Sequence, residues 1–188
     1  MKTDRYTKKF MIENKIALVL GGSGQIGHEI VKAFGIAGAK VIVADNVIKY
    51  DYFDDLKEKK IEAIPVKFDC SNLSNVEDNV LDITKKYGVP DVFVNCSYPR
   101  TKDWAKNNFN EISLSSFSEN INIHLNSFSW IAKIIADQMK QADKSGSIIQ
   151  LGSIYGILGQ DLKLYEGLDM KENMTYSVIK GGITNLTR

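Results

Sequence analysis

A tyrosine and a lysine stand one helical turn apart near the end of the chain, in the run Tyr176-Ser177-Val178-Ile179-Lys180. Residues four apart share one face of a helix, so the phenol and the ammonium would be neighbours. A phenol is a poor base at neutral pH, and a nearby cation stabilises its phenolate form. The pair could therefore exchange a proton with a substrate oxygen. An amphipathic surface helix is the plainer interpretation, and the pair alone does not decide between the two.

A glycine-rich run, GGSGQIG at residues 21–27, lies between an apolar stretch and a helical pattern. Glycines in such a turn let backbone N–H groups approach a pyrophosphate, and the N-terminus of the following helix favours its negative charge. A tight turn without a ligand would use the same residues, so the run alone is weak evidence. Interpreted as a dinucleotide-binding turn, it assigns cofactor contacts to Gly21, Ser23, Gln25, Ile26 and Gly27.

Asp45 closes the second apolar stretch, 18 residues beyond the last glycine of the run. An acid at this place accepts hydrogen bonds from the ribose hydroxyls of NAD and repels the 2′-phosphate of NADP. No arginine stands in the glycine run or at position 46, which also favours NAD as the cofactor. Alternatively, Asp45 simply caps a turn before Asn46.

The elements that must position these residues follow from an alternation of short apolar runs with helical patterns. The runs cover residues 16–20, 40–45, 64–68, 91–95 and 146–151, and the helical patterns cover 25–37, 51–60, 72–87 after an N-cap at Ser71, 117–139 and 175–187. This order predicts an α/β fold, a doubly wound parallel sheet with helices on both faces. Residues 1–12 are mostly polar and basic and predict a flexible N-terminal arm, which leaves residues 13–188 for the domain.

Composition excludes several classes of protein. The chain has 188 residues, 44% of them hydrophobic, and 24 basic side chains against 23 acidic ones give a net charge of +1. A nucleic-acid-binding domain carries a strong basic excess, which is missing. No apolar run approaches the roughly 18 residues of a membrane span, and no secretory signal is recognisable. Cys70 and Cys96 form neither a CxxC pair nor a metal-binding spacing, so we expect a metal-free cytoplasmic protein.

In chain order, the glycine run, Asp45, an asparagine after the fourth strand, a serine after the fifth and the Tyr-x-x-x-Lys pair resemble the short-chain dehydrogenase/reductase family over residues 15–188. The resemblance implies a Rossmann-like domain that binds a nicotinamide dinucleotide. The family's Asn-Asn-Ala-Gly segment falls on Asn95-Cys96-Ser97-Tyr98, where only the first residue matches. The resemblance implies cofactor contacts at Asp69, Cys70, Asn95, Cys96, Ser97, Tyr176 and Lys180, and catalytic roles for Ser153, Tyr176 and Lys180.

The chain departs from the family pattern at several positions. The loop's usual threonine is Leu20 and its middle glycine is Gln25, and both changes keep the tight turn. The family's fourth catalytic residue, an asparagine that supports a proton-relay water, aligns with His124. An imidazole could take over this role, with Asn122 or Asn126 supplying part of it. Alternatively, His124 merely packs between helices.

Residues 159–167 make the segment before the Tyr-Lys pair longer than in most of the family, and we expect them to rise over the active-site mouth. The surrounding pattern resembles a branch associated with flagellin modification and nonulosonate (legionaminic-type) sugar synthesis. The polar groups of Gln160, Tyr165 and Glu166 would suit a polyhydroxylated ligand. An oligomer contact is the alternative use of this segment.

The chain stops at Arg188, inside the helix that carries Lys180. The resemblance implies a further strand, a substrate loop and a closing edge strand, so a C-terminally truncated domain is expected. It also implies a homodimer or a homotetramer, because family members usually assemble through the long helix and the tyrosine-bearing helix.

The sequence as a whole predicts an NAD(H)-dependent oxidoreductase that interconverts a hydroxyl and a carbonyl, on a sugar or sugar nucleotide used for surface or flagellar glycans. Tyr176 would exchange the proton, and Lys180 would assist it and hold the nicotinamide ribose. Ser153 would bond the substrate oxygen, and His124 would feed a proton relay. The departures from the family pattern leave one alternative, a dinucleotide-binding protein with a structural or regulatory role and little catalysis.

Overall fold

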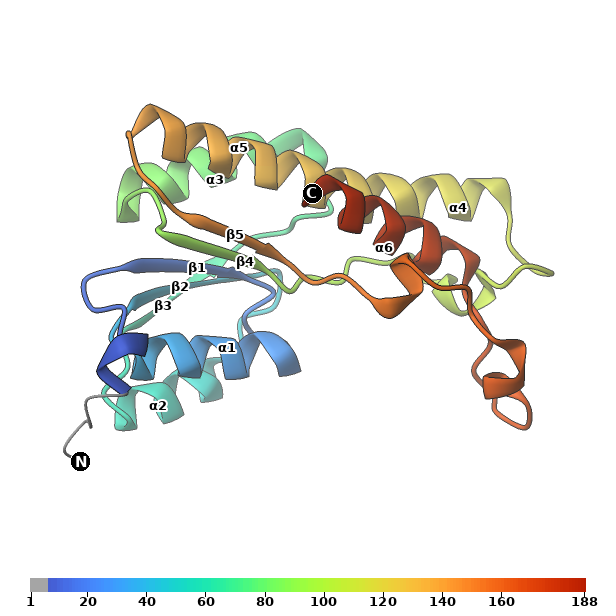
Figure 1. The fold of residues 1–188 in the computed structure, drawn as a ribbon, viewed down its shortest axis with the longest axis horizontal. Coiled ribbons are helices and arrows are strands. Elements are labelled where there is room, and N and C mark those ends of the chain that lie inside the picture. The colour runs from blue at the N-terminus through green and yellow to red at the C-terminus, as the bar shows by residue number, and fades with distance from the viewer. Residues whose placement is uncertain (1–6) are drawn as a thin grey trace.

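The computed structural model describes residues 7–188, and its centre is one sheet of five parallel strands (Figure 1). The strands are β1 (Ile16–Leu20), β2 (Lys40–Asp45), β3 (Ala63–Lys67), β4 (Val92–Asn95) and β5 (Ser147–Gln150). Their order is β3-β2-β1-β4-β5, so the chain reverses its direction of travel across the sheet between β3 and β4. In such sheets a crevice opens at the carboxyl ends of the two strands flanking the reversal, here β1 and β4.

Helices cover both faces of the sheet, which confirms the predicted doubly wound fold. The helices are α1 (Gln25–Ile36), α2 (Tyr50–Glu58), α3 (Leu73–Tyr87), α4 (Leu114–Asn120), α5 (Ser127–Gln141) and α6 (Met174–Leu186). Figure 1 shows α1 and α2 on one face, and α3, α5 and α6 on the other. No helix within residues 7–188 has the length and apolarity that crossing a membrane requires.

Two apolar cores, one on each face, hold these layers together. Successive residues of a strand point to opposite faces, and on β1 Leu18 faces one core while Val19 faces the other. The first core joins the sheet to α3 and α5 through residues such as Phe93 and Ile135, both 0% exposed. The second joins it to α1 and α2 through residues such as Val31. Burial on both faces explains the continuous apolar runs of β1, β2 and β4, whereas the edge strands β3 and β5 are partly exposed.

Most boundaries agree with the sequence-based ones to within one to three residues, and the differences have local causes. The predicted N-cap at Ser71 is wrong: α3 begins after Asn72, while Ser71 donates from its N–H and its hydroxyl to the Asp69 carboxylate. The single helix predicted for 117–139 is α4 and α5 joined by a π-helical segment, Ile121–Asn126. Such segments often mark functional sites.

The predicted arm, residues 1–12, lies partly outside the described residues. Within the described part, Thr7–Phe10 form a 3-10 turn. The N–H of Ile12 donates to the carbonyl of Ala37 at 2.8 Å, and its side chain packs on the second core. The last residues before the first strand are therefore fixed to the domain.

Candidate active site

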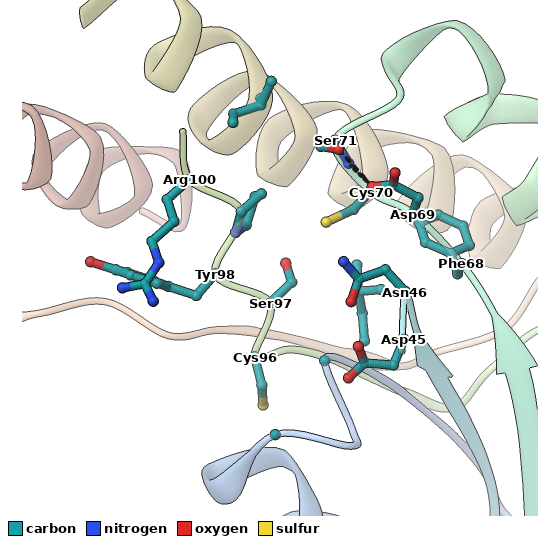
Figure 2. Close-up of a pocket in the computed structure, with 15 residues that line it drawn as sticks. Asp45, Asn46, Phe68, Asp69, Cys70, Ser71, Cys96, Ser97, Tyr98 and Arg100 are labelled. Carbon is teal, nitrogen blue, oxygen red and sulfur yellow. Dashed lines mark hydrogen bonds between the residues drawn. The ribbon is translucent and has the colours of Figure 1, made fainter. Parts of the chain in front are cut away.

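A cleft of about 440 Å³ opens at the carboxyl ends of β1 to β4, where the strand order reverses (Figure 2). Its lining comprises Leu20, Gly21, Gly24, Asp45, Asn46, Phe68, Asp69, Cys70, Ser71, Cys96, Ser97, Tyr98, Pro99, Arg100 and Ile123. Six of these were among the residues assigned to a cofactor from the sequence: Gly21, Asp45, Asp69, Cys70, Cys96 and Ser97. Four strand ends and the π-helical segment thus converge on one cavity.

The glycine turn between β1 and α1 is compact because backbone touches backbone there. Gly21 has a φ of +78°, and a Cβ at this residue would lie 2.6 Å from the backbone nitrogen of Ser97. A Cβ on Gly27 would collide with the carbonyl oxygen of Gly21. Both positions therefore require glycine, and the turn keeps the first turn of α1 close to the end of β4.

Asp45 ties the end of β2 to the glycine turn. One carboxylate oxygen accepts from the N–H of Ser23 at 3.0 Å, and the other accepts from the N–H of Val47 at 3.2 Å. Asp45 therefore does cap the turn that follows β2, as the alternative interpretation held. Each carboxylate oxygen still has a lone pair available to a ligand in the cleft. Gln25 and Ile26 lie exposed at the start of α1, Ile26 to 62%, and line no part of the cleft itself.

The far end of the cleft, beyond β3, carries Asp69 and Cys70. Asp69 is exposed and its carboxylate accepts from Ser71, while Cys70 is buried, and burial raises the pKa of its thiol. Figure 2 shows Phe68, Asp69, Cys70 and Ser71 grouped together on one side of the cavity, facing Asn46. This is an apolar floor with polar groups at its edge, a suitable place for a flat ring.

Asn95 shapes the chain where β4 ends. Its side-chain oxygen accepts from the N–H of Ser97 at 3.1 Å and from the Ser97 hydroxyl at 2.6 Å, which turns the chain directly after the strand. This turn carries Cys96 and Ser97 across Gly21, as the close approach of Gly21 to both residues shows. The side chain of Asn95 is 0% exposed, and its amide nitrogen has no partner within residues 7–188.

Tyr176 and Lys180 lie on α6, whose start is set by Asn173. The Asn173 side chain accepts from the N–H of Tyr176 at 2.8 Å, which caps the helix. Lys180 follows one turn later, is 4% exposed, and its ammonium lies 5.7 Å from the Tyr176 ring centroid. It donates to the carbonyl of Leu151 at 2.6 Å. Burial lowers the pKa of Lys180 to about 8, which a nearby thiol, Cys96, partly opposes.

His124 lies inside the π-helical segment and is 0% exposed. Neither ring nitrogen has a hydrogen-bond partner in the described part of the chain. Burial, reinforced by the Lys180 cation, lowers the pKa of His124 to about 3; the Pro99 backbone lies close enough to oppose this shift weakly, without the geometry of a hydrogen bond. The imidazole is therefore neutral at physiological pH. Its ring packs 5.2 Å from Tyr98 and 5.0 Å from Phe128.

Ser153 follows β5 and begins the 3-10 turn Ile154–Gly156, accepting from the N–H of Tyr155 at 3.2 Å. This turn rests on α6, because a Cβ on Gly156 would lie 2.6 Å from the carbonyl oxygen of Lys180. The Tyr155 ring stands 6.5 Å from that of Tyr176. The structure thereby brings the segments of Ser153, Tyr176 and Lys180 together.

The sequence-based assignment left out Tyr98, which lies between His124 and Tyr176, and Arg100, an exposed side chain over the Tyr98 ring. The Tyr98 ring lies 6.1 Å from that of Tyr176, and the Arg100 guanidinium lies 5.7 Å from the Tyr98 ring centroid. Burial and the neighbouring Tyr176 raise the pKa of Tyr98 to about 12, against the influence of Arg100. Tyr98 stood out in the sequence only as a departure from a family segment, and Arg100 belongs to no motif.

The 157–173 loop is tied to α6 at its base and projects away from the body of the molecule (Figure 1). Gln160 donates to the hydroxyl of Ser177 at 2.7 Å and accepts from the N–H of Asn173 at 2.9 Å, and the Tyr165 hydroxyl donates to Gln160 at 3.0 Å. All residues that line the cleft come from positions 20–123. The structure therefore differs from the expectation of a loop that rises over the mouth: the loop begins beside Tyr176 and extends outward.

Three features of the cleft are suited to a nicotinamide dinucleotide. The glycine turn presents backbone where a side chain has no room, the Asp45 carboxylate stands at the end of β2, and a polar-edged floor follows β3. Among residues 7–188, no three histidine, cysteine or acidic side chains are grouped so as to hold a metal ion.

A model of the short chain dehydrogenase family matches residues 15–188. Post-translational flagellin modification protein A of Campylobacter coli is 33% identical over 181 residues, which cover 94% of this chain and 70% of that protein. The 7alpha-hydroxysteroid dehydrogenase of Bacteroides fragilis is 26% identical over 178 residues, which cover 94% of this chain and 64% of that protein. The chain thus spans 64–70% of the length of these two relatives.

Two solved structures share the fold closely. A short chain dehydrogenase from Leptospira borgpetersenii with bound NAD+ has a TM-score of 0.78 at 24% identity, over 100% of this chain and 67% of that one. A gluconate 5-dehydrogenase from Burkholderia cenocepacia in complex with NADP and tartrate also has a TM-score of 0.78, at 17% identity, over 97% of this chain and 67% of that one. At these identities the likeness concerns the fold alone.

Proposed function

The chain belongs to the short chain dehydrogenase family, and from this premise we propose that it acts as an NAD(H)-dependent oxidoreductase that interconverts a hydroxyl and a carbonyl. The observation that carries the proposal is Lys180, a buried cation one helical turn from Tyr176. Within residues 7–188 it pairs with a backbone carbonyl and with no carboxylate. Its charge therefore remains available to stabilise negative charge on the phenol oxygen.

The glycine turn and the first turn of α1 would hold the pyrophosphate, and Asp45 the adenosine ribose. The remaining cofactor contacts would fall to Asp69, Cys70, Cys96 and Ser97, which line the cleft, and to Ser23, Gln25, Ile26, Asn95 and Lys180, which lie outside its lining. When bound, the nicotinamide ring supplies the chemistry of hydride transfer. The residues of the chain fix the substrate and move the proton.

Tyr176 would give its proton to the carbonyl oxygen in reduction and take it back in oxidation. Lys180 would support the phenolate that forms, and it would also hold the nicotinamide ribose when the cofactor is bound. Ser153, one segment away, would donate a hydrogen bond to the same substrate oxygen. His124 is neutral and its two ring nitrogens have no partner in the described chain, so a water beside it would connect the buried site to a proton relay.

NAD rather than NADP is supported by the Asp45 carboxylate and by a glycine turn without arginine. A sugar or sugar nucleotide, used for surface or flagellar glycans, is supported by the relative named for flagellin modification and by the polar groups at the base of the 157–173 loop. We also propose a homodimer or homotetramer that works in the cytoplasm.

A titration of the protein with NADH and with NADPH, followed by nicotinamide fluorescence, tests the cofactor. We expect NADH to bind at least about tenfold more tightly, because Asp45 repels the extra phosphate. Tighter NADPH binding would contradict the role given to Asp45.

A second measurement tests the reaction. The rate of NADH oxidation is followed with a panel of keto-sugars, and that of NAD+ reduction with the corresponding alcohols. NADH binding without turnover across the panel would instead favour the structural or regulatory alternative.

A further inference from the structure

Charge is distributed unevenly along the cleft. Two carboxylates, Asp45 and Asp69, line the end where the cofactor is placed. Figure 2 shows Arg100 and Tyr98 together on the opposite side, away from both acids. The fixed charges of the lining residues are therefore negative at one end and positive at the other.

Arg100 is positioned at the catalytic end by the Tyr98 ring. Its guanidinium lies 5.7 Å from the ring centroid, a cation–π distance, and the same ring lies 6.1 Å from Tyr176 and 5.2 Å from His124. Only one aromatic ring thus separates the guanidinium from the proton-transfer pair. Arg100 is exposed, and the cation–π contact with Tyr98 favours this position of its side chain.

No carboxylate pairs with Arg100 in the described part of the chain, residues 7–188. A guanidinium held over a ring by a cation–π contact keeps N–H groups for other partners, and these match the geometry of a carboxylate or a phosphate in a two-pronged contact. Lys180, also without an acidic partner, adds a second positive charge at the same end. The catalytic end is therefore built to receive negative charge.

We propose that Arg100 is a specificity-determining residue that binds an oxyanion group of the substrate, so that the substrate is an anionic sugar carrying a carboxylate or a phosphate. This inference rests on the proposed oxidoreductase function, because it places the anion beside the reacting oxygen at Tyr176. Tyr98 is the platform that sets the direction of the guanidinium. The competing ligand for Arg100 is a phosphate of the cofactor, and the experiment separates the two.

The experiment measures binding by calorimetry to the protein saturated with NADH. The probes are matched sugars: D-glucuronate against D-glucose for a carboxylate, and D-glucose 6-phosphate against D-glucose for a phosphate. The variants are Arg100→Met, which removes the charge, and Arg100→Lys, which keeps the charge and loses the planar fork. Lys102→Met is the control, since it removes the same charge from an exposed residue outside the cleft.

We expect the anionic member of one pair to bind at least about tenfold more tightly than D-glucose, and the pair that shows this identifies the carboxylate or the phosphate. Arg100→Met should weaken that binding about 10- to 100-fold, Arg100→Lys should weaken it less, and Lys102→Met should leave it unchanged. Equal binding within both pairs, or an anion preference that survives Arg100→Met, would overturn the proposal.

Two further outcomes separate this proposal from its premises. If Arg100→Met weakens NADH binding by the same factor as sugar binding, the residue serves the cofactor, and the proposal is wrong. If anions bind through Arg100 but no sugar of the panel is oxidised or reduced, the anion site stands and the proposed oxidoreductase function fails.

Discussion

The two ends of the cleft are built in different ways. At the glycine-turn end, backbone packs on backbone, and the Asp45 side chain fastens the turn to β2. At the catalytic end, position is set by side chains, chiefly the rings of Tyr98 and Phe128 around Lys180. Three groups at or beside that end have strongly shifted pKa values: about 12 for Tyr98, which lines the cleft, and about 8 for Lys180 and about 3 for His124, which lie next to the Tyr98 ring outside the lining.

The difference between the two ends follows from what each would bind. A pyrophosphate needs backbone N–H groups at close range, so the first end excludes side-chain volume. A proton-transfer site needs polar groups held in a dry place, and the second end buries Lys180 and His124. It also leaves the ring nitrogens of His124 without partners in the described chain. Changes of volume should therefore damage the first end most, and changes of ionisable groups the second.

The largest expected effect is that of Tyr176→Phe at the catalytic end. The variant keeps the ring that packs near Tyr98 and Tyr155 and removes only the hydroxyl. We expect turnover to fall by about 10²- to 10⁴-fold, the contribution of a general acid–base group. NADH affinity, measured by fluorescence titration, serves as the control and should stay within about twofold. Turnover retained in this variant would refute the assignment of Tyr176.

Gly27→Ala tests the glycine-turn end by volume alone. The added Cβ collides with the Gly21 carbonyl oxygen, so the turn must shift. We expect a loss of about 1–3 kcal/mol in the free energy of unfolding, as for overpacking, and at least about tenfold weaker NADH binding. Gly159→Ala is the matched control, because no atom lies within 4 Å of its added Cβ. Equal effects of the two substitutions would contradict the packing of the turn.

Asp45→Asn tests the glycine-turn end by a change of charge at nearly constant volume. The amide oxygen can keep one backbone hydrogen bond, and the negative charge is lost. We expect NADH binding to weaken about 10-fold, because hydrogen bonds to a charged group are replaced by neutral ones, and the preference over NADPH to shrink. Asp51→Asn, at an exposed residue of α2, should change neither affinity. A preference for NADH that survives in Asp45→Asn would show that another group selects the cofactor.

The glycine-turn end was far easier to predict from the sequence than the catalytic end. Gly21 and Asp45 sit at strand ends, and in a doubly wound sheet the place of a strand end follows from the order of apolar runs alone. The strands β1 and β2 have the predicted bounds for the same reason.

The catalytic end depends on packing between elements that are distant along the chain. Tyr98, which follows β4, meets His124 of the π-helical segment and Tyr176 of α6. No local period of the sequence encodes such a meeting, nor the position of Arg100 over the Tyr98 ring. The same holds for the interruption of the long helix, because the expected apolar stripe continues through residues 121–126 whether they are α- or π-helical.

The smallest expected effect concerns His124 and the pH dependence of stability. In the folded protein the pKa of His124 is about 3, against about 6.5 in an unfolded chain. As the pH falls below 6.5, His124 becomes protonated in the unfolded chain but stays neutral in the folded protein. This residue therefore makes the free energy of unfolding decrease with falling pH. Between pH 7 and pH 5.5 the loss should be about 1 kcal/mol, and His124→Asn should remove it.

Denaturant unfolding of the wild-type protein and of His124→Asn at pH 7 and pH 5.5 measures the contribution of His124. The contribution of His28 is the same in both proteins and cancels in the comparison. If the two proteins lose the same free energy of unfolding over this range, His124 is reached by water and protonated in the folded state. The catalytic end would then be open to solvent, and the contrast between a site built from backbone and one built from buried ionisable side chains would fail at its most buried residue.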